Sequence, residues 1–164
     1  MKNKGTFSTI QLTTLVLLRF LIGWHIFYEG LSKLLNPLWS SSGFLRESKW
    51  ILSGFADWII TNSKLLDVVD FLNTWGLIAI GLGLILGLFA RTAAIVGALL
   101  LLMYYLNSPP LIGIEYSLPS EGNYLIVNKT LIEAVALFAL AIFPTSTMVG
   151  FDFYVEKLRK GKKQ

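Results

Sequence analysis

Four long apolar segments dominate this chain of 164 residues and constrain its fold more than any other feature. A membrane-spanning helix needs about 20 apolar residues. The first and last segments reach that length, while the middle two are shorter and are separated only by Arg91, which predicts a tight helical hairpin. Backbone polar groups inside a bilayer need internal partners, so the segments are expected to be helices. We therefore predict one all-α membrane domain over 1–164, a four-helix bundle with spans at about 12–35, 72–90, 92–106 and 124–143.

The composition supports a membrane protein and excludes several chemistries. Hydrophobic residues make up 54% of the chain and charged residues only 15%, against about 25% charged in soluble domains. The net charge of +4 is therefore interpreted through membrane topology, and no nucleic-acid partner is expected. The chain has no cysteine and one histidine, His25, so it is expected to hold no metal or haem of its own. A redox role would need an organic cofactor or a partner subunit.

The basic residues predict the orientation. The basic start at 1–4 leads into a long apolar run without an A-x-A cleavage site, and we interpret this run as a retained first span. Positive charges favour the cytoplasmic side, so both termini are predicted to be cytoplasmic. Four crossings place one set of basic residues on that side: Lys2, Lys4, Arg91, Lys157, Arg159, Lys160, Lys162 and Lys163. The opposite loops hold Arg46, Lys49 and Lys64.

The first outer connection, 36–74, is too long for a simple turn. Apolar residues at helical spacing predict two amphipathic helices, at about 44–60 and 63–72, with Asn62 before the second as a cap. Four nearby tryptophans favour the membrane interface: Trp39, Trp50, Trp58 and Trp75. These helices could equally be a lid without chemistry. The second outer loop, 107–123, is rich in proline and glycine and could cap a site.

Small residues at four-residue spacing predict close helix packing. Gly83 and Gly87 form one such pair, and Ala93 and Gly97 form another on the next span.

Ionisable residues inside the spans are the main functional signal, because a charge there is costly. The first span carries Arg19, His25, Glu29 and Lys33 on one arc of its helix, and this stripe is expected to face the bundle. The fourth span brings Glu133, Asn128 and Lys129 to a similar depth in the outer half of the membrane. Tyr104, Tyr105 and Asn107 end the third span on the same side.

This convergence predicts a polar pocket for a head group such as a quinone. Glu29, Glu133 and His25 are the candidate catalytic residues, because carboxylates and an imidazole can exchange protons. The candidate binding residues are Arg19, Lys33, Tyr104, Tyr105, Asn128 and Lys129.

A purely structural interpretation stays open. Glu29 and Lys33 can form an i, i+4 ion pair, Arg19 can pair with a carbonyl or a lipid phosphate, and His25 can be an interhelical hydrogen-bond donor. Arg91 can serve topology alone.

The sequence resembles the DoxX family of small four-helix membrane proteins and, within it, the DoxD-like branch. The resemblance lies in three motifs and covers most of the chain, including the long first outer loop. The motifs are Leu18-Arg19-x3-Gly23-x5-Glu29-Gly30-x2-Lys33, Gly81-x-Gly83-Leu84-x2-Gly87-Leu88-x2-Arg91, and the stretch from Pro144 to Gly150-Phe151-Asp152.

The resemblance implies the small membrane subunit of a thiosulfate:quinone oxidoreductase in the cytoplasmic (inner) membrane of a bacterium or archaeon. Menaquinone or ubiquinone would be the cofactor, and a redox partner subunit, in the membrane or outside it, would supply electrons. The alternative is a non-catalytic scaffold or a carrier of lipids or other small molecules. Membrane lipids are expected partners in either case, and a homo-oligomer stays open.

Overall fold

The computed structural model describes residues 7–117 and 125–161, and within these ranges it contains helices and no strand. The predicted all-α class is therefore confirmed. Seven helices are formed in this part of the chain: α1 (Thr9–Leu34), α2 (Ser42–Arg46), α3 (Ser53–Thr61), α4 (Ser63–Leu86), α5 (Ala90–Asn107), α6 (Lys129–Ile142) and α7 (Asp152–Gly161).

Three of these helices, α1, α4 and α5, are long and apolar enough to cross a membrane. Helix α6 has 14 residues and is about 21 Å long, shorter than the roughly 30 Å hydrocarbon core. The fourth span was predicted to begin at 124, which lies outside the described residues, and the helix itself begins only at Lys129. Three candidate spans are therefore found, and the four-helix bundle stays a prediction.

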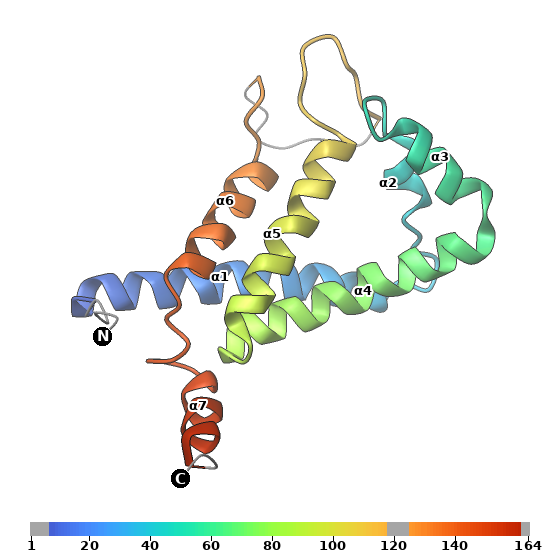
Figure 1. Cartoon of the computed structure of the whole chain (residues 1–164). Coiled ribbons are helices and arrows are strands. Elements are labelled where there is room, and N and C mark those ends of the chain that lie inside the picture. Colours follow the sequence, from blue (N-terminus) through green and yellow to red (C-terminus); the bar gives the residue numbers. More distant parts are fainter. Residues whose placement is uncertain (1–6, 118–124, 162–164) are drawn as a thin grey trace.

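The long helices are arranged as two pairs. In Figure 1, α1 and α4 lie alongside each other, and α5 and α6 form a second pair that crosses the first. The core lies where the pairs meet and includes three leucines and an isoleucine with at most 1% exposure: Ile26, Leu77, Leu84 and Leu137. We call the end that carries α2 and α3 the loop end, and the end that carries the α4–α5 turn and α7 the turn end.

Small residues let the paired helices approach closely. A Cβ atom on Gly81 of α4 would lie 2.5 Å from the backbone nitrogen of Phe27 on α1, so only glycine fits at this contact. Gly83 and Ala93, one from each predicted pair, pack α4 against α5, because a Cβ on Gly83 would lie 3.1 Å from the Cβ of Ala93, whereas Gly87 faces Gly150 and Arg19. The α1–α4 contact was not predicted from the sequence.

The α4–α5 turn has the form that the sequence predicts for a tight hairpin. Gly87 ends α4 with φ +65, a left-handed conformation that glycine adopts without strain. Helix α5 begins three residues later, with Arg91 exposed in its first turn.

The first long connection differs from its predicted form. The helix expected at 44–60 is divided into α2 and α3 by residues 47–52, and the segment 63–72 is the beginning of α4 rather than a separate helix. Asn62 accepts a hydrogen bond from the Leu65 backbone N–H at 3.3 Å, as a cap should. The chain contains no proline between 63 and 86, so the helix continues into the span.

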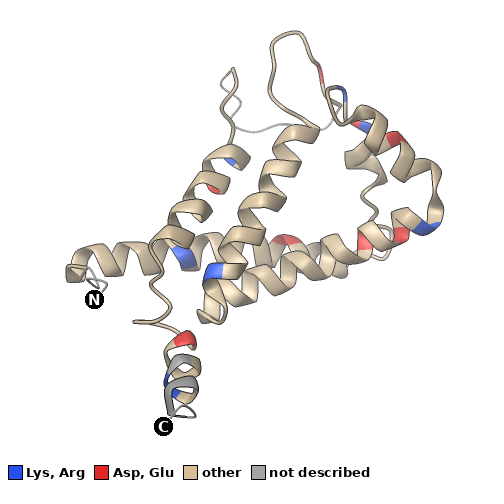
Figure 2. Cartoon of the chain, viewed as in Figure 1, with Lys and Arg blue, Asp and Glu red and all other residues tan. Residues whose placement is uncertain are grey.

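Charged residues are sparse along the long helices and gather at the loop end, around α3 and the start of α4 (Figure 2). Lys2, Lys4, Lys162 and Lys163, on which the predicted orientation depends, lie outside the described residues. The orientation therefore stays a prediction.

Candidate functional site

A chain of polar contacts joins three helices near the loop end. The Lys33 Nζ of α1 lies 2.9 Å from Glu29 Oε1 and donates a hydrogen bond to Asn73 Oδ1 of α4 at 2.9 Å. The Asn73 amide then donates from Nδ2 to the Tyr104 hydroxyl of α5 at 2.6 Å. The chain Glu29, Lys33, Asn73, Tyr104 thus ties α1, α4 and α5 together, and we call it the polar chain.

Lys33 is the centre of the polar chain. Its side chain is 13% exposed, and its Nζ lies 4.9 Å from the ring centroid of Trp39 and 5.4 Å from that of Tyr104. These distances allow cation–π attraction. The ammonium is therefore held at a defined position by one carboxylate, one amide and two rings.

The polar chain borders two cavities that share a wall. The polar cavity, of about 220 Å³, is lined by Glu29, Lys33, Trp39, Ser41, Phe44, Asn73 and Tyr104. The apolar cavity, of about 270 Å³, lies among α2, α3, α4 and α5. Ser41, Phe44, Asn73 and Tyr104 line both, so the two cavities are adjacent.

Helix α2 covers both cavities and is fastened there by polar and aromatic contacts. The Ser41 backbone N–H donates to Asp70 Oδ1 at 2.8 Å, and Asn107 Nδ2 donates to the Phe44 carbonyl at 2.9 Å. The rings of Phe44 and Tyr104 meet edge to face at 5.2 Å. The first long connection thus supplies walls of both cavities.

A second polar cluster lies between α1 and α6. His25 Nδ1 is 3.1 Å from Glu133 Oε1, and His25 Nε2 is 3.1 Å from Lys129 Nζ. The Lys129 ammonium can donate to Nε2 of the imidazole, whereas the contact between Nδ1 and Glu133 is close without the geometry of a hydrogen bond. None of the three side chains lines the polar or the apolar cavity.

Two further predicted binding residues hold the start of α6. The Tyr105 hydroxyl donates to the Ile126 carbonyl at 2.7 Å, and Asn128 accepts from the Leu131 backbone N–H at 3.0 Å as the cap of α6. Neither residue lines the two cavities.

Arg19 lies at the turn end and is 5% exposed. Its guanidinium donates to Thr145 Oγ1 at 3.1 Å and to the Val149 carbonyl at 2.8 Å. It is about 21 Å from Lys33 along the axis of α1, so the structure does not bring Arg19 to the polar chain.

Four residues of the polar cavity were not predicted from the sequence as site residues: Trp39, Ser41, Phe44 and Asn73. Asn73 could have been found, because an uncharged amide within a predicted span also needs a hydrogen-bond partner. The other three lie in the long connection, where helical spacing gave no indication of which side chains would turn toward the spans.

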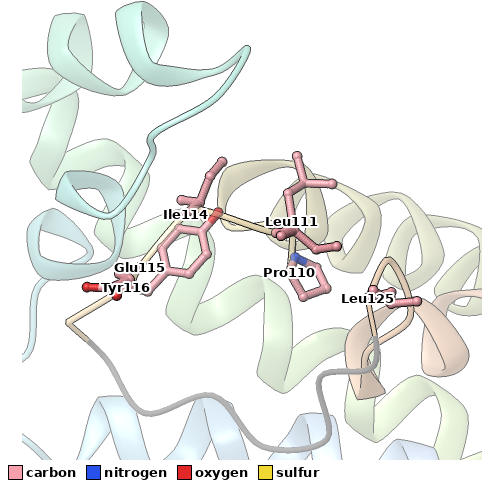
Figure 3. Close-up of a pocket in the computed structure, with 7 residues that line it drawn as sticks. Pro110, Leu111, Ile114, Glu115, Tyr116 and Leu125 are labelled. Carbon is pink, nitrogen blue, oxygen red and sulfur yellow. The ribbon is translucent and has the colours of Figure 1, made fainter.

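A third cavity, of about 460 Å³, lies in the connection between α5 and α6 and is drawn in Figure 3. Tyr116 lines it, and burial raises the pKa of this phenol, whose hydroxyl donates to the Pro109 carbonyl at 2.7 Å. The loop is fastened to the α2–α3 link, where the Ser117 backbone N–H donates to Glu47 Oε2 at 2.9 Å and lowers the pKa of that carboxyl. Lys49 donates to the Glu115 carbonyl beside it. Because its walls are loop residues, this cavity is a weaker candidate for a ligand from the membrane.

Among the described residues, no group of three or more His, Asp or Glu side chains is placed to hold a metal ion. The side chains of the polar chain can donate and accept hydrogen bonds and exchange protons.

The chain matches the DoxX family over residues 14–107, more than half of its length. This region includes α1 from its second turn, α2, α3, α4 and α5, and hence the whole polar chain and all the residues that line the polar and apolar cavities. No curated protein and no solved structure shows a significant match.

Proposed function

Since the chain belongs to the DoxX family of membrane proteins, we propose that this multi-pass membrane protein binds a quinone in the paired cavities, as a membrane subunit of a redox complex similar to the DoxD subunit. The observation that carries the proposal is the shared wall: the same four residues line a polar cavity with fixed donors and an apolar cavity of similar size. A quinone has this division, with carbonyl oxygens at one end and an isoprenoid tail at the other. Ligand pockets are commonly apolar with a few placed polar groups.

The polar chain fits a quinone carbonyl. Tyr104 accepts a hydrogen bond from Asn73, so its own proton can be donated to a ligand oxygen. Lys33 uses two of its three protons on Glu29 and Asn73, which leaves one for a ligand. We assign Lys33 and Tyr104 to carbonyl binding and Glu29 to proton exchange.

The apolar cavity fits the tail and faces the membrane. Three of its lining side chains are at least half exposed on the outside of the molecule: Phe55 50%, Leu72 62% and Met103 53%. Exposed apolar side chains suit contact with lipid, and Leu72 and Met103 lie on the candidate spans α4 and α5. A lipid-soluble molecule could therefore enter from the bilayer without crossing water.

His25 and Glu133 keep a role in proton exchange within this proposal. His25 lies one helical turn from Glu29 on the same helix and contacts both Glu133 and Lys129. This cluster would exchange protons with Glu29 from the side of α1 that contacts α6. The proposed orientation places the loop end outside the cytoplasmic membrane, where a partner subunit would supply electrons.

Trp39 provides the test, because it lines the polar cavity and quinones quench indole fluorescence. We expect a short-tailed benzoquinone to quench the purified full chain in nanodiscs with a saturable component. Trp39→Phe should remove that component. Trp24→Phe is the matched control, since Trp24 is 53% exposed on α1 and should report only unsaturable quenching from the lipid. Saturable quenching that survives Trp39→Phe, or none in the wild type, would contradict the proposal.

A carrier of lipids or other small molecules is the second candidate, favoured by the same exposed apolar wall. A phospholipid could place its phosphate at Lys33 and a chain in the apolar cavity. Competition distinguishes the quinone site from the lipid carrier. A phospholipid added in detergent would displace bound quinone from a lipid carrier, whereas quinone would stay bound at a quinone site.

A further inference from the structure

Helix α7 is not part of the proposed quinone site, and its two faces differ in character. Phe151, just before the helix, and Tyr154 and Leu158 within it follow an i, i+3, i+7 spacing that puts these apolar residues on one side of α7. They are 53%, 62% and 71% exposed. Five basic residues stand between 157 and 163, against two acidic residues from 152 onward. Helix α7 is therefore amphipathic and basic, with an apolar face that the described helices leave uncovered.

The start of α7 is fixed to the ends of two candidate spans. Asp152 accepts hydrogen bonds from the backbone N–H groups of Phe89 at 2.7 Å and Ala90 at 3.2 Å, at the beginning of α5. The backbone N–H of Asp152 donates in turn to the Gly87 carbonyl at 2.9 Å, at the end of α4. Where candidate spans end, the membrane surface begins, so these bonds hold the first turn of α7 at the depth of the head groups.

The length and charge of α7 indicate what it contacts at the depth of the head groups. Its 10 residues extend about 15 Å, too short to cross a bilayer. Figure 1 shows α7 projecting beyond the α4–α5 turn, away from the helix pairs. Arg91, exposed in the first turn of α5, adds a positive charge next to it. A short basic amphipathic helix at a membrane surface matches anionic phospholipids in both polarity and charge.

We infer that α7 is a surface-binding helix for anionic phospholipids, with Tyr154 and Leu158 inserted at the level of the acyl chains and the basic residues among the head groups. This inference is independent of the quinone site. It assigns the C-terminal segment to the lipid leaflet at the turn end. The competing hypothesis is that a second copy of the chain covers the apolar face of α7.

The absence of cysteine allows a direct test on the full chain. A nitroxide would be attached to Leu158→Cys. The matched control is a nitroxide on Lys160→Cys, because position 160 follows position 158 by about 200° around the helix. Both chains are placed in nanodiscs with phosphatidylglycerol or with phosphatidylcholine alone. The accessibility of the label to a water-soluble nickel complex and to oxygen is then measured.

In phosphatidylglycerol discs we expect a loss of nickel accessibility and a gain of oxygen accessibility at 158 but not at 160. The contrast should shrink in phosphatidylcholine discs, and also when Lys157, Arg159 and Lys160 are replaced by glutamine on the Leu158→Cys chain. If Leu158→Cys fails to fold by circular dichroism, Tyr154→Cys takes its place.

Three outcomes would overturn the inference. The first is equal nickel accessibility at the two positions in phosphatidylglycerol discs, and the second is a contrast that does not depend on lipid charge. The third is spin–spin broadening, which would show that a second copy covers the apolar face.

Discussion

Arg19 and Lys33 are both cations on α1, about four turns apart, and they are used in different ways. At the turn end, Arg19 is 5% exposed and is bound by a threonine hydroxyl and a backbone carbonyl of the segment before α7. At the loop end, Lys33 is bound by Glu29 and Asn73 and borders a cavity. The same kind of sequence signal thus marks a structural brace at one end and a candidate binding group at the other.

The difference follows from what surrounds each charge. A buried polar group must be paired with a protein group, with water or with a ligand. Around Arg19 the backbone is packed closely: a Cβ on Gly87 would lie 3.0 Å from an Arg19 guanidinium nitrogen. Around Lys33 there is open volume, so part of its hydrogen-bonding capacity remains for a ligand.

Replacing Arg19 should have the largest effect on stability. We expect Arg19→Leu to lower the free energy of unfolding by about 2–4 kcal/mol, because the Thr145 hydroxyl and the Val149 carbonyl would lose their buried partner. Denaturant unfolding of the purified chain in detergent measures this change. Arg19→Lys should recover part of the loss, because it restores one donor.

The comparison would fail if Arg19→Leu weakened quinone binding in chains that remain folded while leaving their stability unchanged. That result would show that Arg19 acts in ligand binding and does not stabilise the fold through Thr145 and Val149.

Replacing Lys33 or Tyr104 should show the opposite pattern. Lys33→Met and Tyr104→Phe each remove one donor from the polar chain, and we expect quinone affinity to fall about tenfold, equivalent to about 1.4 kcal/mol. Stability should change by only about 0.5 kcal/mol for Lys33→Met, since a partly exposed i, i+4 ion pair contributes little. Binding isotherms from tryptophan quenching and unfolding curves of the same preparations separate the two effects.

Tyr105→Phe is the matched control for Tyr104→Phe, because the Tyr105 hydroxyl contacts the Ile126 carbonyl instead of the cavities. Equal losses of affinity in both variants would argue against the assigned site.

Replacing Asp152, at the turn end, should have a smaller effect on stability than replacing Arg19. Asp152→Ala removes the acceptor for the first N–H groups of α5, and loss of such a cap costs about 1 kcal/mol. Unfolding should shift accordingly, while quinone affinity stays the same. Asp67→Ala, at an exposed position of α4, should have almost no effect on either quantity.

The smallest expected effect is on the contact between Glu47 and Ser117 at the loop end. The Ser117 N–H holds the pKa of the Glu47 carboxyl below its ordinary value of 4.5. The contact therefore stabilises the folded loop above pH 4.5 and is lost as the pH falls through the lower folded pKa. We expect the amide resonance of Ser117 to titrate with this lowered pKa in nuclear magnetic resonance spectra.

Glu47→Gln should abolish that titration. A Ser117 resonance that still titrates in Glu47→Gln would show that another group causes it.

Helix positions could largely be predicted from the sequence, because apolar length and the glycines at 83, 87 and 97 carry that information. The sequence did not predict where two of the helices begin. Segment 63–72 is amphipathic like an interfacial helix, yet nothing interrupts it before the span, so α4 is continuous. At the other end of the chain, α6 begins only at Lys129.

The candidate site was only partly predictable. Helical spacing placed Glu29 and Lys33 together, because i, i+4 contacts are local. The single pocket expected from the sequence divides into the polar chain and the His25 cluster, since helix spacing does not show which neighbour each side of α1 faces. Asn73 and the α2 residues depend on packing between distant segments, which a single sequence does not specify.

The central claim, that the paired cavities bind a quinone, is tested most directly by photolabelling. An azido-benzoquinone with a short alkyl tail would be activated on the full chain in nanodiscs, and the labelled peptides would be mapped by mass spectrometry. We predict labels at the cavity walls, in residues 29–45, 52–59, 69–73 and 100–107, that are lost when unlabelled quinone competes. Labels that concentrate around His25 and Glu133, or that spread over lipid-facing positions such as Trp24 and resist competition, would contradict the account.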